Sequence, residues 1–343
     1  MKFVIDSAIP FVQGVFEPYA DVVYKEGTAI CREDISDADA MIIRTRTKCD
    51  QELLEGTPVQ MISTTSIGTD NIDLPYCRSH GIFVQNAPGS NAGGVMNYVF
   101  SALYGAASRK SIPLMGATMG IVGVGQVGSR VETMARHLGF KVLLCDPPRA
   151  EMEGPGQFCS LDFLLQNSDI VTLHVPLNAE TKGMADAEFF AKMKLGALFV
   201  NTARGEIVNE DDLIAAIPRL GPVIIDTWNN EPNVNKRLLE LADICTPHIA
   251  GYSYQGKQRG TSAAVRAVAR FFDIPQLFEF FPPADIKELE AVKLDFTGMT
   301  QGEITSAIQY NYPIFTDDFM FRIDPSGFER LRAGYSYRRE FFI

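Results

Sequence analysis

The sequence contains little histidine and tryptophan, and its cysteines are widely spaced. Of its 343 residues, 4 are His and 1 is Trp, and no two of the six cysteines form a CxxC pair. Zinc and iron–sulfur sites need close clusters of such ligands, so we expect no metal site. Isolated cysteines are typical of reduced thiols in a cytoplasmic protein. The six are Cys31, Cys49, Cys77, Cys145, Cys159 and Cys245.

Positive charge is also scarce. Lys and Arg number 31 against 42 Asp and Glu, a net charge of −11, and no basic run exceeds two residues. Such a chain repels the phosphates of nucleic acids and anionic membranes, although a few buried cations suffice for a small anionic substrate. Long uncharged apolar stretches are missing, at the N-terminus as elsewhere. We therefore expect no nucleic-acid partner, no membrane partner and a cytoplasmic location.

Short apolar runs alternate with amphipathic stretches along most of the chain. This alternation predicts an α/β protein with doubly wound parallel sheets and helices on their faces. Short helices are expected over 35–40 and 50–54, and long ones over 91–109 and 253–273. Strands are expected over 3–5, 41–43, 61–64, 82–84, 119–122, 141–145, 170–174, 197–200 and 222–225.

The most specific motif is the glycine pattern Gly123-Val124-Gly125-Gln126-Val127-Gly128, between an expected strand and an expected helix. Gly123 permits a tight turn, Gly125 lets a pyrophosphate approach the backbone, and Gly128 lets helix and strand pack closely. The helix N-terminus attracts phosphate. Asp146 ends the next strand, where its carboxylate would bind a ribose and repel a 2′-phosphate. The motif predicts a dinucleotide site that prefers NAD to NADP, although the nearby Arg149 argues the other way.

Three further polar residues follow expected strands of the same lobe. Arg204, Glu231 and His248 each lie in a loop rich in turn-forming residues. Because the carboxyl ends of parallel strands converge on one crevice, a cation, an acid and a histidine could share one site there. The pattern alone leaves His248 equally compatible with a structural role. The other histidines, His80, His137 and His174, are more typical of structural positions.

These motifs resemble those of the D-isomer-specific 2-hydroxyacid dehydrogenases. The matching segments are the glycine motif with Asp146, then 201–205, 226–232 and 247–251, in the family's order. The resemblance implies an NAD-dependent dehydrogenase with a Rossmann-like and a flavodoxin-like lobe. Its catalytic residues would be Arg204, Glu231 and His248. Its cofactor contacts would be Gly123, Gly125, Gln126, Val127, Gly128, Asp146, Val175, Thr202, Ala203, Asp226 and Gly251.

A narrower resemblance, over nearly all of 1–273, is to the branch of the family that acts on a phosphorylated four-carbon acid. It rests on 44–48, 68–70, 87–89, 145–150 and 248–252. It implies oxidation of 4-phospho-D-erythronate to 2-oxo-3-hydroxy-4-phosphobutanoate in pyridoxal 5′-phosphate (vitamin B6) biosynthesis. One departure is Asn97, where this branch often has an acid. Substrate contacts would be Arg44, Thr45, Arg46, Ser66 and Tyr252, with Lys48 on the same face if the preceding strand continued.

The same resemblance divides the chain into three parts. Residues 1–93 with 253–273 would form a substrate-binding lobe, and 94–252 the NAD-binding lobe. The aromatic-rich remainder, 274–343, would form a small α+β domain that makes a homodimer. Alternating apolar residues such as those over 319–323 belong to this part.

Two other functions remain open from the sequence. One is another NAD-dependent D-2-hydroxyacid dehydrogenase, of the 3-phosphoglycerate or glycerate type. The other is a non-catalytic NAD-sensing binding protein, similar to the corepressors that resemble this family. Turnover of any 2-hydroxy acid would exclude the second.

Overall fold

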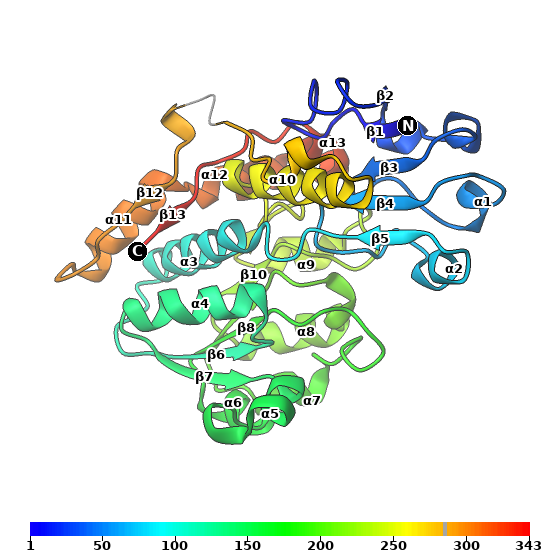
Figure 1. The fold of residues 1–343 in the computed structure, drawn as a ribbon. Helices are drawn as coiled ribbons and strands as arrows, with labels where there is room; N and C mark the ends of the chain where they lie inside the picture. Colours follow the sequence, from blue (N-terminus) through cyan, green and yellow to red (C-terminus); the bar gives the residue numbers. More distant parts are fainter. Residues whose placement is uncertain (284–286) are drawn as a thin grey trace. The chain divides into compact units, whose positions relative to one another are not determined.

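The computed structural model describes residues 1–283 and 287–343 and separates them into two compact units (Figure 1). Unit 1 comprises Met1–Asn91 and Ser253–Glu290, and unit 2 comprises Ala92–Tyr252 and Ala291–Ile343. The chain thus passes from one unit to the other near residues 92, 253 and 291. Residues 274–343 do not cluster as a third unit but are divided between the other two.

Unit 1 is built on a five-stranded parallel sheet in the order β2-β1-β3-β4-β5, which is the flavodoxin-like order. Helix α10 covers one face, and α1 and α2 cover the other. The strands are β1 (Lys2–Asp6), β2 (Asp21–Lys25), β3 (Ala40–Ile43), β4 (Met61–Thr64) and β5 (Phe83–Gln85). The helices are α1 (Gln51–Leu54), α2 (Leu74–Ser79) and α10 (Tyr254–Phe271).

Strand β3 shows why this sheet reads as continuous apolar runs. Ala40 and Ile42 pack under α10, whereas Met41 and Ile43 face the opposite core. Side chains alternate between the faces of a strand, and both faces are buried here. The prediction of a helix over 35–40 is wrong, because the only helical turn near this segment is the 3₁₀ turn η2 (Arg32–Ile35).

Unit 2 contains a six-stranded parallel sheet in the order β11-β10-β9-β8-β6-β7. Phe158 adds a single parallel bridge to Leu144 beyond the β7 edge. With this bridge counted as a short third strand, the chain order across the sheet is the Rossmann order with one further strand, β11. The strands are β6 (Thr118–Val122), β7 (Lys141–Cys145), β8 (Ile170–Leu173), β9 (Leu198–Asn201), β10 (Val223–Ile225) and β11 (Ile244–Cys245).

Helices cover both faces of this sheet, as the doubly wound prediction requires (Figure 1). One core lies under α3 (Ala92–Arg109) and α4 (Gln126–His137). The other lies under α6 (Leu161–Asn167), α7 (Ala187–Lys192), α8 (Glu210–Ala216) and α9 (Lys236–Leu241). Helix α5 (Pro147–Glu153) follows β7.

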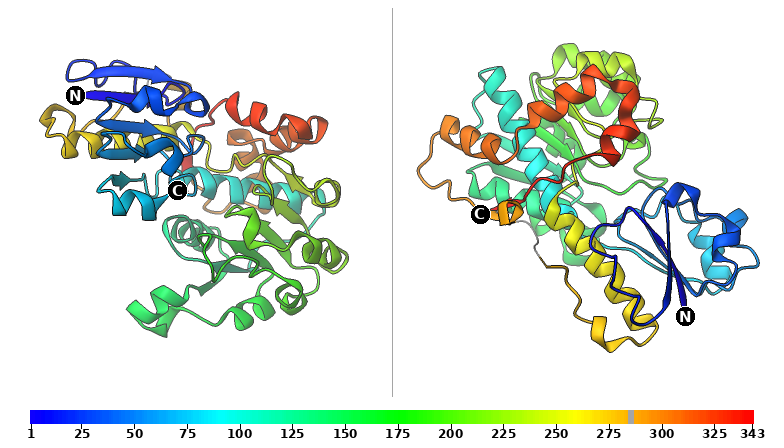
Figure 2. Two further views of the ribbon diagram at one scale, coloured as in Figure 1. Left: turned by 90° about the vertical axis from the view of Figure 1, so that its right-hand side faces the viewer. Right: turned by 90° about the horizontal axis from the view of Figure 1, so that it is seen from above.

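The end of the chain packs on unit 2 as helices and one short two-stranded sheet. Residues 319–323 lie in a helix, in which Phe321 stacks edge-on against the buried Trp228. Figure 2 shows α11 and α12 running beside α3, with which they share a core. The elements are β12 (Val292–Lys293), α11 (Gln301–Asn311), α12 (Ile314–Ile323), α13 (Phe328–Ala333) and β13 (Phe341–Phe342).

No helix within 1–283 and 287–343 has both the length and the apolar composition that crossing a bilayer would need.

Candidate active site

Three neighbouring strands of unit 2 end at the same edge of the sheet. Strands β9, β10 and β11 are adjacent and parallel, so their carboxyl ends lie together. Arg204, Glu231 and His248 follow these three strands in turn. The topology therefore gathers the loops that carry the predicted cation, acid and histidine.

His248 and Glu231 are in direct contact. The ring Nδ1 lies 2.8 Å from Oε2 and 3.1 Å from Oε1 of Glu231, and the Trp228 amide donates to Oε1 at 2.9 Å. Burial would raise the pKa of Glu231, but His248 and the Trp228 amide outweigh it and lower that pKa below its ordinary value. An ionised carboxylate only accepts hydrogen bonds, so Nδ1 carries the proton and Nε2 is left as the basic atom.

Arg204 lies in a loop that packs against the loop of Glu231. A Cβ on the following residue, Gly205, would lie 1.9 Å from the carbonyl carbon of Trp228, so only glycine permits this approach. The side-chain amide of Asn201 donates to the carbonyl of Arg204 at 3.1 Å. These contacts fix the backbone of Arg204 next to the segment from Trp228 to Glu231.

The loop that carries His248 is held by the buried carboxylate of Asp226. Its Oδ1 accepts the Ile249 amide at 2.8 Å and the Thr246 hydroxyl at 2.6 Å, and its Oδ2 accepts the Ala250 amide at 3.0 Å. Burial raises the pKa of Asp226. His248 itself has a φ of 54°, in the left-handed region that non-glycine residues rarely adopt. This backbone conformation persists because its surroundings fix it.

The glycine motif folds as the turn that its sequence predicts. Gly123 has a φ of 87°, and a Cβ there would lie 2.7 Å from the amide nitrogen of Val175. A Cβ on Gly128 would lie 2.1 Å from the carbonyl oxygen of Gly123, so α4 packs directly on the turn. Nothing lies within 4 Å of a Cβ on Gly125, which leaves open space in front of the helix. Gln126 and Val127 form the start of α4, where amide groups are available to phosphate.

Asp146 lies beside this turn at the end of β7. Its Oδ2 accepts the Val124 amide at 2.7 Å, and its Oδ1 accepts the Arg149 amide at 3.0 Å as the cap of α5. The Arg149 guanidinium is engaged by the Glu153 carboxylate at 2.7 and 2.8 Å and by the Val124 carbonyl at 2.7 Å. The side chain that argued for a 2′-phosphate is therefore committed elsewhere, which favours NAD.

Other predicted cofactor contacts lie near the same edge. The hydroxyl of Thr202 is buried without a hydrogen-bond partner among the described residues, and Ala203 follows it. An orphaned hydroxyl after β9 suits a ligand group. Val175, another predicted contact, follows β8 next to His174, whose pKa burial lowers to about 3, so that ring is neutral at physiological pH. Gly251 lies in the His248 loop. These residues fit a bound dinucleotide.

Unit 1 carries four of the five predicted substrate contacts at the carboxyl edge of its own sheet. Thr45 and Arg46 form a turn directly after β3, and Ser66 follows the neighbouring β4. The Arg44 Nε donates to the fully buried Asp6 carboxylate at 2.8 Å. Strand β3 ends at Ile43, so the condition under which Lys48 would share a face with Arg44 and Arg46 is not met.

Two further predicted residues, and two that the sequence did not mark, complete the description of the candidate site. The Lys48 ammonium pairs with Asp50 at 2.6 Å and is largely exposed, so it has the character of a surface ion pair. Tyr252, in unit 2, packs edge-on against Tyr335. The sequence did not single out Trp228 or Arg338, although both contact the loops of the candidate site. Their side chains donate to backbone carbonyls that are distant in sequence, Thr246 O for the Trp228 indole and Tyr252 O for Arg338, and no local pattern marks such contacts.

Comparisons with known proteins bear on this arrangement. Residues 101–250 match the family model described as D-isomer specific 2-hydroxyacid dehydrogenase, NAD binding domain. Erythronate-4-phosphate dehydrogenase of Bacteroides fragilis is 41% identical, over 99% of this chain and 97% of its own. The enzyme of the same name from Cronobacter sakazakii is 36% identical, over 99% and 92%.

The chain belongs to the erythronate-4-phosphate dehydrogenase family. It is thus an NAD-dependent oxidoreductase, and residues 101–250 are its NAD-binding domain. NAD⁺-bound 3-phosphoglycerate dehydrogenase of Entamoeba histolytica is 29% identical, with a TM-score of 0.69 over 81% of this chain and 97% of its own. D-Lactate dehydrogenase of Aquifex aeolicus, solved with NAD and lactic acid, is 26% identical, with a TM-score of 0.66 over 83% and 100%. The family, the fold and the cofactor predicted from the sequence are confirmed.

Proposed function

We propose that the protein oxidises the C2 hydroxyl of 4-phospho-D-erythronate to the ketone, giving 2-oxo-3-hydroxy-4-phosphobutanoate for pyridoxal 5′-phosphate biosynthesis. The observation that carries the proposal is the contact between His248 and Glu231, next to the loop of Arg204 at the edge of an NAD-binding sheet. The names of the relatives supply the substrate. Bound NAD⁺ supplies the hydride acceptor.

The residues of unit 2 have separate roles in this proposal. His248 Nε2 takes the proton of the C2 hydroxyl, since Nδ1 is occupied by Glu231. Glu231 keeps the ring in this tautomer and stabilises the imidazolium that forms. The Arg204 guanidinium, with its forked donors, holds the substrate carboxylate and polarises the developing carbonyl oxygen.

The substrate phosphate needs cations and hydroxyl donors of its own. We assign this role to Arg44, Thr45, Arg46 and Ser66, and a further substrate contact to Tyr252. The ion pair with Asp6 offsets part of the Arg44 charge.

We also propose that the protein is a cytoplasmic homodimer that uses its C-terminal part for association. Six free thiols support the compartment. Large exposed apolar side chains on α11 and α12 support the association.

A substrate panel tests the activity. Purified protein with NAD⁺ is offered 4-phosphoerythronate, erythronate and 3-phosphoglycerate, and NADH absorbance is followed. We expect 4-phosphoerythronate to give the highest kcat/KM, exceeding that of erythronate by at least about 10²-fold because the phosphate contacts are lost. Equal values would refute the phosphate assignment, and no turnover of any acid would favour a binding protein.

His248→Gln in the same assay tests the base. We expect kcat to fall by about 10²–10⁴-fold, the range typical of losing a general base. His137→Gln, at the exposed end of α4, is the matched control and retains wild-type turnover. An unchanged rate in His248→Gln would remove this residue from the mechanism.

A further inference from the structure

We propose that Arg338 is a positioning residue for the catalytic loop, residues 246–252, so that one side chain of the C-terminal segment, residues 335–343, holds that loop in place. This inference rests on the proposed function, because it concerns where His248 is held during turnover. Arg338 lies about 90 residues further along the chain than His248, in a part of the molecule otherwise assigned to association.

The Arg338 guanidinium is directed at the carbonyl groups of the catalytic loop. Its Nη1 donates to Tyr252 O at 2.7 Å and to Ile249 O at 3.3 Å, and its Nη2 donates to Ala250 O. Nη2 also donates to Gly94 O at 3.1 Å, at the start of α3. One planar group thus joins three loop carbonyls to a long buried helix.

Asp226 and Arg338 hold opposite sides of the same backbone. The Asp226 carboxylate accepts amide groups of Ile249 and Ala250, while Arg338 donates to the carbonyls of those two residues. An anion on the N–H side and a cation on the C=O side orient the peptides in one direction. Together they can hold the left-handed conformation of the neighbouring His248.

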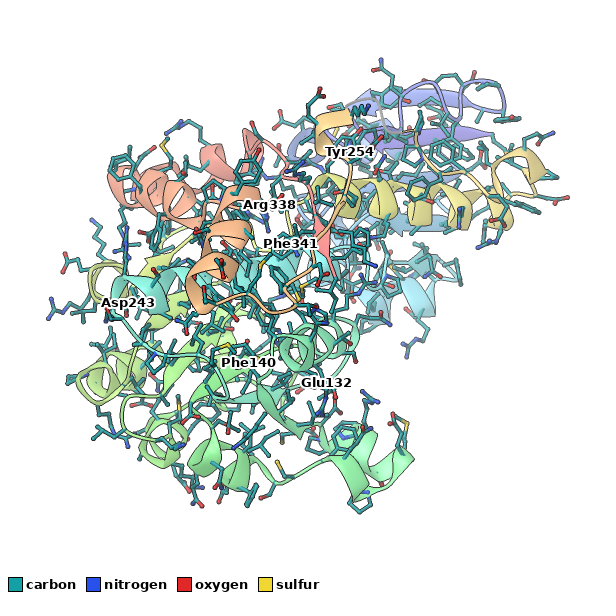
Figure 3. All side chains as sticks on the ribbon, turned by 90° about the vertical axis from the view of Figure 1, so that its left-hand side faces the viewer. Glu132, Phe140, Asp243, Tyr254, Arg338 and Phe341 are labelled. Carbon is teal, nitrogen blue, oxygen red and sulfur yellow. The ribbon has the colours of Figure 1, made fainter. Side chains whose placement is uncertain are left out.

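The surroundings of Arg338 stabilise a buried guanidinium through an aromatic ring and a carboxylate. The residue is 9% exposed and lies within the body of unit 2, as does Phe341 of the same segment (Figure 3). Its guanidinium lies 3.9 Å from the ring centre of Tyr312. The Asp317 carboxylate, which offsets the charge, is fixed by the hydroxyls of Tyr312 and Tyr335 at 2.8 Å each.

Asn97 fixes the C-terminal segment in place. Its Nδ2 donates to Phe341 O at 2.8 Å, and its Oδ1 accepts the Phe341 amide at 3.0 Å. An ionised carboxylate at this position could make only the second bond. The departure at residue 97 noted in the sequence is therefore matched to the backbone of the segment that carries Arg338.

Arg338 acts through the loop and does not contact the substrate. Its hydrogen bonds are committed to backbone carbonyls and to the Tyr335 hydroxyl. Removing them should displace His248 from its aligned position. The Tyr252 ring keeps its packing against Tyr335 and Tyr337, and Arg204 lies in another loop, so both substrate contacts stay in place. The expected signature is a loss in kcat with little change in KM.

The test compares Arg338→Met with Arg339→Met. Arg339 is the adjacent arginine, and its guanidinium binds the Asn311 side chain at 2.8 and 3.1 Å. We expect Arg338→Met to lose at least about 30-fold in kcat, with the KM for 4-phosphoerythronate within about threefold, since small misplacements of a catalytic group cost up to about 10²-fold. The isotope effect on kcat with substrate deuterated at C2 should rise, and Arg339→Met should match wild type.

The outcomes separate this inference from the proposed function. Wild-type protein that oxidises no 2-hydroxy acid refutes both. An active wild type with Arg338→Met turning over at the wild-type rate overturns the positioning role alone. If Arg338→Met does not unfold cooperatively, Arg338→Lys decides, because it keeps the charge but cannot reach all the carbonyls. A kcat reduced by about threefold or more at unchanged KM supports the role, and a wild-type kcat overturns it.

Discussion

Among single side chains, the one that sets the chemistry of the site is Glu231. Its lowered pKa keeps it ionised, and an ionised carboxylate can only accept the Nδ1 proton of His248. A glutamine there has an amide that can donate to Nδ1 instead and so place the ring proton on Nε2. The tautomer that serves as base would then be lost without any change in volume.

We therefore predict that Glu231→Gln lowers kcat by about 10²–10⁴-fold with little change in KM, as a wrong tautomer does in hydrolase triads. The carboxylate also contributes to stability, with a pH dependence that follows from the lowered pKa. This contribution is fully present above its ordinary pKa of 4.5 and is lost as pH falls from there through the lower pKa of the folded state. The wild type should thus lose more Tm than Glu231→Gln between pH 6 and pH 3. An active variant with normal kcat would contradict the tautomer argument.

At the level of the elements, strand β6 is joined to helix α4 by the glycine turn. Gly125 and Gly128 have different functions in this turn. Gly128 contacts the turn itself, since its Cβ would overlap the Gly123 carbonyl oxygen at 2.1 Å. Gly125 contacts nothing within 4 Å and has a φ of −79°, which any residue adopts. Gly128 is therefore required for folding, and Gly125 is required for the close approach of the pyrophosphate.

This difference predicts opposite phenotypes for two conservative changes. Gly128→Ala should lower the free energy of unfolding by about 1–3 kcal/mol, because helix and turn must separate. Gly125→Ala should leave Tm unchanged but weaken NADH binding by at least about tenfold, since a methyl group takes the place of the approaching pyrophosphate. Thermal unfolding and NADH fluorescence titration measure the two effects. Equal losses of stability in both variants would contradict the assignment.

The elements also show what the sequence could and could not predict. Strands β3, β4, β6 and β8 are buried on both faces, so continuous apolar runs marked them. Strand β2 was missed because its short apolar run, Val22-Val23-Tyr24, is flanked by charged residues and is only partly buried at the edge of the sheet. The apolar pattern over 319–323, interpreted from the sequence as alternating, lies in the helix α12, where Phe321 packs against the buried Trp228.

The candidate site divides in the same way. Arg204, Glu231 and His248 were predictable because parallel strands bring their carboxyl ends together, and this holds before any contact is known. The Arg338 contacts were not predictable, because they join backbone carbonyls to a side chain that is distant in sequence. The strand continuation that grouped Lys48 with Arg44 failed at a turn with no glycine or proline to signal it.

Considered as a whole, the molecule leaves large apolar side chains exposed near its C-terminus. Tyr310, Phe319 and Ile323 are 82%, 61% and 58% exposed. Phe319 and Ile323 are four residues apart on α12 and so lie on one helical face. An exposed apolar face of this kind is typical of an association surface, and a second copy of the chain is the partner that we propose.

We predict that the wild type sediments at twice its chain mass of 37.9 kDa. The double variant Phe319→Glu, Ile323→Glu should sediment as a monomer, because the two new carboxylates would be buried without partners at a twofold interface. The matched control is Leu195→Glu, since Leu195 is 81% exposed and lies in the loop before β9. This control should remain dimeric. If the α12 variant stays dimeric, association uses another surface, and if the wild type is monomeric at micromolar concentration, the exposed face serves a different partner. Because Arg338 belongs to the same C-terminal part of the chain, a monomeric variant with reduced kcat would further link association to the position of His248.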